Sequence, residues 1–356
     1  MCADPHPGAR LRQRQQLTRG VSLVELMIGL VIGLLVSLAA VSSLRIFGAS
    51  QSQGTVTGGG LLSAVSAMGA IKNDVAAAGL GFFDGRLPLC SAMNLSLGTG
   101  AIVNGTVFSP LLVTREPAND RLDLVYGSNV SAGSSVPLAT PSDGSSIDTL
   151  STLPAAVGQV VMLAPTSTGL CTVRSVTAVT TGTVDTPQVL AFANTGAHNQ
   201  FAFSTAPAYA AQARATLLGA LQWHRYRVID NNLVLEQPLD GSSAVLVRNV
   251  IGFRVEYGIS DTGGSTLQSW QNAGDAGWGT LSAASISRVR AVRLGLVVRS
   301  PQREKPDASG NCIASSAKPR LFGAEIEPDV SDWGCYRYRS STIVVPLRNL
   351  VWGQTR

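Results

Sequence analysis

The chain has 356 residues, of which 45% are hydrophobic, 14% charged and 6% aromatic, and this length suits one large or two modest domains. Few charges and 37 glycines argue against a long-helix or coiled-coil protein and favour a β-rich body with many loops. The formal net charge is +5, but four arginines and one aspartate in residues 1–20 leave +2 for the remainder, which disfavours nucleic acid as a partner.

A long apolar segment follows the basic N-terminal stretch. Residues 26–44 contain no charged side chain, and such a run approaches the ~20 residues that span a bilayer. It is longer than the ~7–15-residue core of a secretory signal, and no A-x-A cleavage site follows it. Because basic flanks stay cytoplasmic, we expect one transmembrane helix over about residues 21–45, with the rest of the chain across the membrane. A plain signal anchor explains all of this except Glu25.

Glu25 lies near the start of the apolar segment, where a carboxylate costs roughly 2.5 kcal/mol or more at depth and less near the interface. The unsatisfied N–H groups of a helix N-terminus favour its negative charge. A positive partner would compensate it more fully. Cleavage between Gly20 and Val21 would create one, the α-amino group of Val21, and would make Glu25 the fifth residue of the processed chain.

The stretch RGVSLVELMI, residues 19–28, resembles the processing site of type IV prepilins and type II secretion pseudopilins. The resemblance implies that a prepilin peptidase cleaves after Gly20 and removes a cytoplasmic leader, residues 1–20. It implies that Val21 becomes the N-methylated first residue and that Glu25 pairs with a neighbouring subunit's N-terminal amine during assembly. Two features depart from the family: Val21 stands where Phe is usual, and the leader is longer than most.

A second helical stretch is predicted beyond the membrane, so that the N-terminal helical unit covers residues 21–80. Glycines at 54 and 58–60 predict a break or kink near residues 54–60. Apolar residues at helical spacing then form one face: Leu61, Val65, Met68, Ile71, Val75 and Ala78. Gly79 and Gly81 follow and predict the stop. We therefore expect this half of the helix to pack on a globular body.

Short β-type runs separated by Gly, Ser, Asn and Pro clusters predict a β-rich domain over residues 81–356, with an insertion or separate lobe around 90–220. Residues 127–152 carry few large apolar side chains and are expected to form an exposed loop or an insertion. Alternating polarity in residues 253–257 predicts a half-buried strand.

Two features near the C-terminus concern the strands themselves. Arginines occupy the even-numbered positions 288 and 290, but apolar residues occupy the even-numbered positions from 292 onward. This change predicts a bulge near 291 or a strand buried on both faces. The run 342–345 ends at Pro346, which predicts an edge strand or a strand end.

The order of segments in the C-terminal half is similar to the PilW family of minor pilins. These segments are LVLEQPL, AVLVRNV, GFRVEYGISD, RVRAVRLGLVVRS and YRYRSSTIVVPLRN. The resemblance implies an α+β, pilin-like fold: a long N-terminal helix, half transmembrane and half amphipathic, packed on a mainly antiparallel β-sheet domain.

The same resemblance implies a minor pilin that primes type IV pilus assembly. Its expected partners are the prepilin peptidase, other minor pilins and the major pilin, and a tip adhesin is compatible with this role. It implies a single pass through the inner membrane, with the C-terminal domain in the periplasm before the subunit enters the filament or its tip. Twitching motility, adhesion or DNA uptake would be downstream consequences.

Four cysteines remain after the leader with Cys2 is removed, and they allow three disulfide pairings. In a periplasmic domain, disulfides persist. Cys312 with Cys335 is favoured because the bridge would close a Gly-, Ser- and Pro-containing loop and stabilise it by about 3 kcal/mol. Cys90 and Cys171 then remain as the second pair, and isolated buried thiols are the alternative. Without a C-x-x-C motif or clustered histidines, no metal site is predicted.

No catalytic motif occurs in the chain, so we expect neither an enzyme nor a cofactor. His198 and His224 are the histidines that follow the leader, and His224 lies in a strand-like run. Residues 261–264 are expected to form a turn. Arginines at 288, 290, 293, 299, 337 and 339 leave a DNA-binding face as a lesser alternative to solvated strand faces.

Two other functions stay open at this point. A minor pseudopilin of a type II secretion system would share the N-terminal helix and differ in its partners. A signal-anchored periplasmic enzyme or binding module would keep its N-terminus uncut.

Overall fold

The computed structural model describes residues 27–28, 30–34, 37, 63–84, 87–129, 131–183 and 185–351. The chain forms two compact units, Met1–Thr55 and Val56–Arg356. In the first unit the described residues are helical, and their large apolar side chains are all more than half exposed. Within the described parts of the chain, no helix is both long and apolar enough to cross a membrane. The predicted span over residues 21–45 lies mostly outside the described residues.

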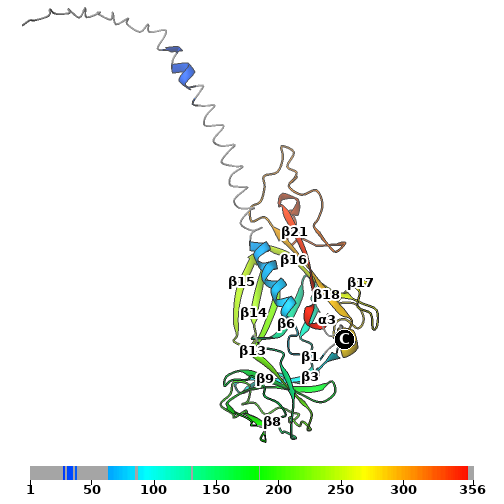
Figure 1. Cartoon of the computed structure of the whole chain (residues 1–356). Helices are drawn as coiled ribbons and strands as arrows, with labels where there is room; N and C mark the ends of the chain where they lie inside the picture. The colour runs from blue at the N-terminus through cyan, green and yellow to red at the C-terminus, as the bar shows by residue number, and fades with distance from the viewer. Residues whose placement is uncertain are drawn as a thin grey trace, which may run out of the picture. The chain divides into compact units, whose positions relative to one another are not determined.

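A helix over residues 63–77 begins the described part of the second unit (Figure 1). Its buried face consists of Ala64, Ala67, Met68, Ile71, Val75 and Ala78. The predicted face is therefore confirmed from Met68 onward, but Val65 was placed wrongly. It is 59% exposed, because small alanines one residue before it and two residues after it occupy the contact instead. Leu61 and the predicted break at 54–60 lie outside the described residues.

The helix ends where the sequence predicts. Gly79 and Gly81 have φ angles of 77° and 87°, a left-handed conformation that glycine adopts without steric cost. The amide of Gly79 donates to the carbonyl oxygen of Val125 at 2.9 Å, and the amide of Gly127 donates to that of Leu80 at 3.0 Å. The turn after the helix is thus bonded directly to the sheet.

The larger sheet has ten strands, and all its described pairs are antiparallel except β10 with β3. Seven lie in the following order: β15 (Ser242–Arg248), β14 (Asn232–Gln237), β13 (Arg214–Ile229), β9 (Val160–Ala164), β10 (Gly169–Ser175), β3 (Cys90–Leu97) and β4 (Gly100–Val107). The other three are β6 (Asp120–Ser128), which pairs with β13 and with β5 (Leu111–Arg115), and β7 (Ser135–Pro137), which pairs with β13.

The 16-residue strand β13 connects the two ends of this sheet. Its first part, up to Gly219, pairs with β9 and β7, and its second part pairs with β6 and β14. The change of partners coincides with register shifts around Gly219, whose φ is 70°. Opposite this point, a Cβ on Gly127 would lie 2.6 Å from the Leu218 carbonyl oxygen, so a larger side chain is excluded.

A second sheet has the strand order β17 (Ser269–Asn272), β16 (Val250–Ile259), β18 (Val289–Arg299) and β21 (Tyr338–Pro346). The alternation predicted for residues 253–257 is confirmed: Phe253, Val255 and Tyr257 are buried and the two charged residues are half-buried. A register shift places Arg290 as the extra residue of β18, which confirms the predicted bulge. β21 is an edge strand that ends at Pro346, also as predicted.

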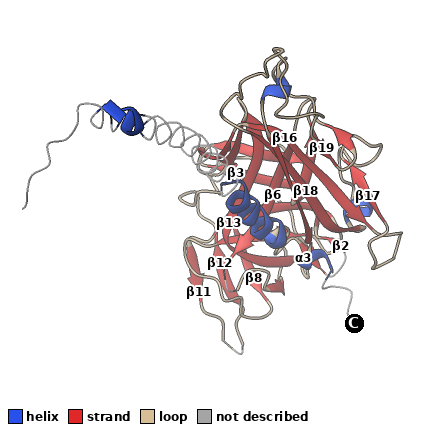
Figure 2. Ribbon diagram, turned by 90° about the horizontal axis from the view of Figure 1, so that it is seen from above, coloured by secondary structure: helices blue, strands red, loops and turns tan. Residues whose placement is uncertain are grey.

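One core joins the helix to both sheets. Viewed from above, the helix lies across β6 and β13 (Figure 2), and its buried face packs with residues of β5, β6, β13, β16, β18 and β21 in one apolar cluster. The predicted arrangement, a helix packed on a mainly antiparallel β domain, is confirmed for the described residues. The predicted transmembrane half lies mostly outside them.

The prediction of an exposed loop over residues 127–152 is wrong. This region supplies β7 and β8 (Ser146–Thr149), and β8 forms a three-stranded sheet with β12 (Gln188–Ala191) and β11 (Ala178–Thr180). The region has few apolar side chains, but Val136, Leu138 and Ile147 all point into a separate core with residues of β9 and the first part of β13. The sparse apolar residues are therefore positioned for burial.

The remaining elements are short. They are the hairpin of β1 (Phe83–Asp84) and β2 (Leu87–Pro88), the hairpin of β19 (Arg320–Leu321) and β20 (Ala324–Glu325), the helices α2 (Ala283–Ile286) and α3 (Arg348–Val351), and the 3-10 turn η1 (Trp333–Cys335). Two disulfides, Cys90–Cys171 and Cys312–Cys335, have Cα–Cα separations of 5.4 and 4.6 Å. These are the two pairings favoured from the sequence.

Candidate functional site

A cluster of polar contacts fastens the helix to the large sheet. Asp74 stands on the helix, and its Oδ1 accepts a hydrogen bond from the Tyr126 hydroxyl at 2.9 Å. Its Oδ2 accepts from the Tyr226 hydroxyl at 2.5 Å and lies 2.5 Å from His224 Nδ1. The partners come from β6 and β13, so one carboxylate connects the helix to two neighbouring strands.

The environment of Asp74 favours its ionised form. Burial raises the pKa of this carboxyl, but hydrogen bonds from His224, Tyr226 and Tyr126 outweigh burial and lower the pKa below its ordinary value. Burial, together with the neighbouring carboxylate, raises the pKa of both tyrosines, so their hydroxyls remain protonated donors. The cluster is a charged acceptor surrounded by donors, and each tyrosine–aspartate bond is charge-assisted.

A second contact holds the C-terminal end of the same helix. Asn349, on α3, points its side-chain Nδ2 at the last carbonyl oxygens of the helix: it lies 2.9 Å from that of Ala77, 3.1 Å from that of Ala78 and 3.4 Å from that of Ala76. The final carbonyl groups of a helix have no partner within the helix, and a side-chain donor satisfies them. The two ends of the described domain are thereby locked together.

The two sheets are joined by Asp120, which is 1% exposed. Its Oδ1 accepts from Arg115 and Arg254, each at 3.1 Å, and its Oδ2 accepts from the Val255 amide at 2.8 Å. The neighbouring Asn119 accepts from the amide of Phe253 at 2.7 Å. These contacts fix β6 against β16 and so join the two sheets beneath the helix.

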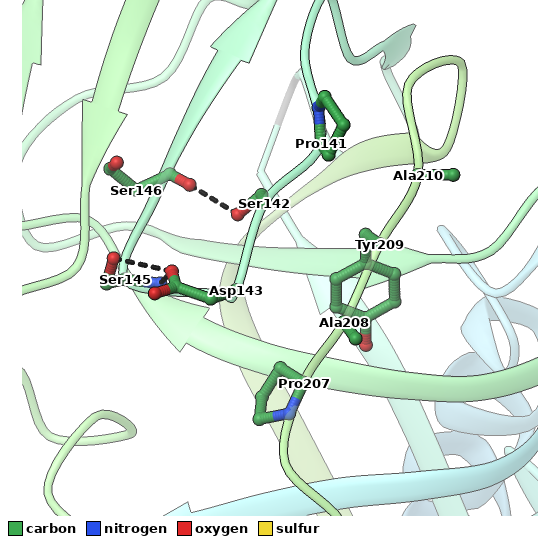
Figure 3. Close-up of a pocket in the computed structure, with 9 residues that line it drawn as sticks. All are labelled: Pro141, Ser142, Asp143, Ser145, Ser146, Pro207, Ala208, Tyr209 and Ala210. Carbon is green, nitrogen blue, oxygen red and sulfur yellow. Dashed lines mark hydrogen bonds between the residues drawn. The ribbon is translucent and has the colours of Figure 1, made fainter.

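A surface pocket of about 720 Å³ lies beside the separate core that contains Val136, Leu138 and Ile147 (Figure 3). Its lining residues come from two segments, residues 141–146 and 207–210. Ser142 donates to the carbonyl oxygen of Ser146, and Asp143 accepts from the amide and hydroxyl of Ser145. The Tyr209 hydroxyl donates to Thr172 at 2.8 Å. These polar groups are thus engaged in hydrogen bonds within the protein and form no catalytic constellation.

The histidines considered from the sequence have structural contacts. His198 is buried, with Nδ1 2.5 Å from the Ser96 carbonyl oxygen, and burial lowers its pKa. His224 belongs to the Asp74 cluster. Residues 261–264 form a turn, closed by the Gly264 amide and the Asp261 carbonyl at 2.9 Å. Over the described residues, no group of three or more His, Cys, Asp or Glu is placed to hold a metal ion.

Five of the six arginines considered as a DNA-binding face form hydrogen bonds or ion pairs within the domain. Their partners are Ser260 for Arg288, Gly264 for Arg290, Glu256 for Arg293, Asp329 for Arg299 and Glu304 for Arg337. Arg293 also stacks against the rings of Trp270 and Phe322 at 4.7 and 4.3 Å from their centroids. These guanidinium groups hold loops and strands of the domain together.

The residues predicted to carry processing and assembly, Gly20, Val21 and Glu25, lie outside the described residues. The helix-to-sheet cluster was not predicted. One signal was present in the sequence: His224 and Tyr226 are two residues apart on a strand, so their side chains point to the same face. Asp74 lies off the predicted apolar face of the helix, and no local pattern marks it as the partner of this pair.

Residues 209–349 match the family model of the type IV pilus-assembly protein W, PilW. Among solved structures, the type IV-like pilin TTHA1219 from Thermus thermophilus is similar at 9% sequence identity, with a TM-score of 0.34. That comparison covers 81% of this chain and 95% of the pilin. Comparison with curated protein sequences found no significant match.

The matched segment begins just before β13 and ends at Asn349, so it includes the four strands of the second sheet and the contacts of Tyr226, His224 and Asn349 with the helix. Over these residues the chain is similar to the PilW family of type IV pilus-assembly proteins.

Proposed function

We propose that this protein is a minor pilin that takes part in type IV pilus assembly with other minor pilins and the major pilin. The observation that carries the proposal is the PilW match over residues 209–349 in a chain whose residues 19–28 resemble a prepilin processing site. The two features are independent, since one lies in the β domain and the other at the N-terminus.

In this proposal a prepilin peptidase cleaves between Gly20 and Val21 on the cytoplasmic side and methylates Val21. The segment over about residues 21–45 holds the subunit in the inner membrane, with its β domain in the periplasm. Glu25 then pairs with the N-terminal amine of a neighbouring subunit when the helix enters the filament. In an apolar surrounding the attraction between the two charges offsets part of the desolvation penalty that each would bear alone.

The packing of the helix supports the assembly role. A subunit that is drawn from the membrane by its N-terminal helix needs a firm connection between that helix and its globular domain. The Asp74 cluster and the Asn349 contact fasten the last turns of the helix over residues 63–77 to the β domain. The proposed role in the pilus is structural and requires no catalytic group.

Substitution of Glu25 tests the proposal in cells that produce the full-length protein. Glu25→Ala is expected to leave leader cleavage intact and to deplete the subunit from sheared filaments. Ser22→Ala, another polar position in the same segment, serves as the matched control and is expected to enter filaments at the wild-type level. Normal filament entry by Glu25→Ala would overturn the pairing role, and absence of the wild-type protein from filaments would overturn the pilin function itself.

A further inference from the structure

The edge strand β21 has one hydrogen-bonded neighbour among the described residues. β18 pairs with it along its whole length, from Arg299 opposite Tyr338 to Ala291 opposite Pro346, with no shift of register. On its other side, no described strand continues the sheet.

Two backbone hydrogen bonds that flank the pairing fix which residues of β21 face β18. The amide of Leu347 donates to the carbonyl oxygen of Arg290 at 2.9 Å, and the amide of Ser300 donates to that of Arg337 at 2.8 Å. In an antiparallel pair, hydrogen-bonded residues alternate with residues whose N–H and C=O groups point away from the partner. Since 337 and 347 are both odd, the odd-numbered residues between them bond to β18.

The even-numbered residues Ser340, Thr342 and Val344 therefore direct their N–H and C=O groups out of the sheet edge. Pro346 has the same parity, so the nitrogen that lacks a hydrogen also faces outward and removes no bond to β18. The side chains of all three residues are exposed, and Val344 is 53% exposed. Among the described residues, this edge is accessible and its outward backbone donors and acceptors have no strand partner.

β21 is the edge strand best suited to receive another strand. Long, regular edges are templates for pairing, whereas bulges, prolines and charges protect them. Between Arg339 and Pro346 there is no charged residue or proline. The other described edges are shorter or less regular: β15 has a register shift with its neighbour, β4 has two, and β5 and β17 have only five and four residues.

The charges around the edge select the chemistry of a partner. Arg339 and Arg348 are exposed, and no described carboxylate forms an ion pair with either. The chain from Trp333 to Arg356 contains no Asp or Glu. An extended segment alongside β21 would thus meet positive charge at both ends of the strand and would be favoured by carboxylates of its own.

We propose that the free edge of β21 binds an extended, carboxylate-bearing segment of another pilus subunit, which adds a fifth strand to the β17-β16-β18-β21 sheet. The proposal rests on the pilin function, which supplies the neighbouring subunit. Main-chain hydrogen bonds to Ser340, Thr342 and Val344 provide affinity, and Arg339 and Arg348 provide selectivity, as in other cases of strand addition.

Thr342→Pro tests the proposal because it removes one outward N–H without removing a bond to β18. Proline is tolerated at an edge position of this parity, and the preceding residue is already extended. Thr342→Ala is the matched control, since it shortens the side chain but keeps the amide. Both purified variants are expected to unfold at the wild-type temperature.

The readout is recovery of the full-length subunit in sheared filaments from cells. Recovery of Thr342→Pro is expected to fall about tenfold or more, since one lost hydrogen bond and a clash with the added strand exceed about 1.4 kcal/mol. Thr342→Ala is expected to match the wild type. Wild-type recovery of Thr342→Pro would overturn the strand-addition proposal while leaving the pilin function in place. Absence of the wild-type subunit from filaments would overturn both.

Hydrogen exchange of the wild-type protein gives a second measurement that needs no variant. In the purified protein the amides of Ser340, Thr342 and Val344 are expected to exchange fast, and in sheared filaments they are expected to become protected. The amides of Ser341 and Ile343 serve as internal controls, since they are bonded to β18 in both states. Equal exchange of the outward amides in the two states would contradict the proposal.

The acidic character of the partner is tested by Arg339→Glu. Filament recovery is expected to fall, whereas Arg248→Glu, an exposed arginine on the edge strand β15, is the matched control and is expected to have no effect. If Arg248→Glu were the deleterious change, docking would have to occur at β15 and the assignment to β21 would be overturned.

Discussion

Tyr226 on β13 donates a 2.5 Å hydrogen bond to the carboxylate of Asp74 on the helix, across 152 residues of sequence. This contact joins the N-terminal helix to the part of the chain that matches the PilW family.

Asp74→Ala is expected to lower the free energy of unfolding by about 3 kcal/mol. The substitution removes a charged acceptor and leaves the hydroxyls of Tyr126 and Tyr226 without their partner, and each such loss costs roughly 1–3 kcal/mol. Urea unfolding of the purified protein measures the effect. Lys72→Ala, an exposed position on the same helix, is the control and should change the value by less than about 0.5 kcal/mol. Equal effects of the two substitutions would contradict the role of Asp74.

The contribution of Asp74 depends on pH in a defined direction. Its pKa is lowered in the folded protein, so its stabilising effect is fully present above the unfolded value of about 3.9 and is lost as pH falls through the folded pKa. Asp74→Asn keeps the shape but not the charge. The difference in unfolding free energy between wild type and Asp74→Asn is therefore expected to be constant between about pH 5 and 7 and to shrink below about pH 4. A difference that stayed constant down to pH 3 would show that the charge is irrelevant.

Asn349→Ala is expected to destabilise the end of the helix. Its side chain satisfies carbonyl groups that would otherwise be unpaired, so the loss should cost about 1–2 kcal/mol. The amide of Gly79, at the turn that follows, should exchange faster with solvent in the variant. Arg348→Ala, one residue earlier and exposed, should leave both values unchanged. Unaltered exchange at Gly79 in Asn349→Ala would mean that another contact holds the helix end.

The sequence predicted the elements whose pattern is local and failed where the contacts are distant. The helix stop at Gly79 and the alternation around Val255 depend on neighbouring residues, and both were found. The register shift at Arg290 also appears in the sequence, because the apolar residues change from odd-numbered to even-numbered positions there. Residues 127–152 were misassigned, because the burial of their few apolar side chains depends on strands that lie further along the chain.

The helix-to-sheet cluster could be predicted only in part. The spacing of His224 and Tyr226 places them on one face of a strand, but nothing local indicates which carboxylate they meet. Asp74 becomes their partner through the packing of the helix on β6 and β13, which brings together residues 150 positions apart. The processing residues Gly20, Val21 and Glu25 differ from this cluster. Their motif can be recognised in the sequence, but they lie outside the described residues, so their roles remain a prediction.

Loss of the disulfides should destabilise the domain to different degrees. With sequence separations of 81 and 23 residues, the chain-entropy relation gives about 4.5 kcal/mol for Cys90–Cys171 and about 3.4 kcal/mol for Cys312–Cys335. Paired serine substitutions, Cys90→Ser with Cys171→Ser and Cys312→Ser with Cys335→Ser, followed by urea unfolding, measure the two values. Non-reducing peptide mapping of the wild-type protein is the control, and four free thiols in that map would contradict both bridges.

Mass spectrometry of the N-terminus of the membrane-extracted protein tests the central claim most directly. The pilin function predicts a chain that begins at Val21 and carries a methyl group on its α-amino nitrogen. A chain that retains residues 1–20 intact would contradict it.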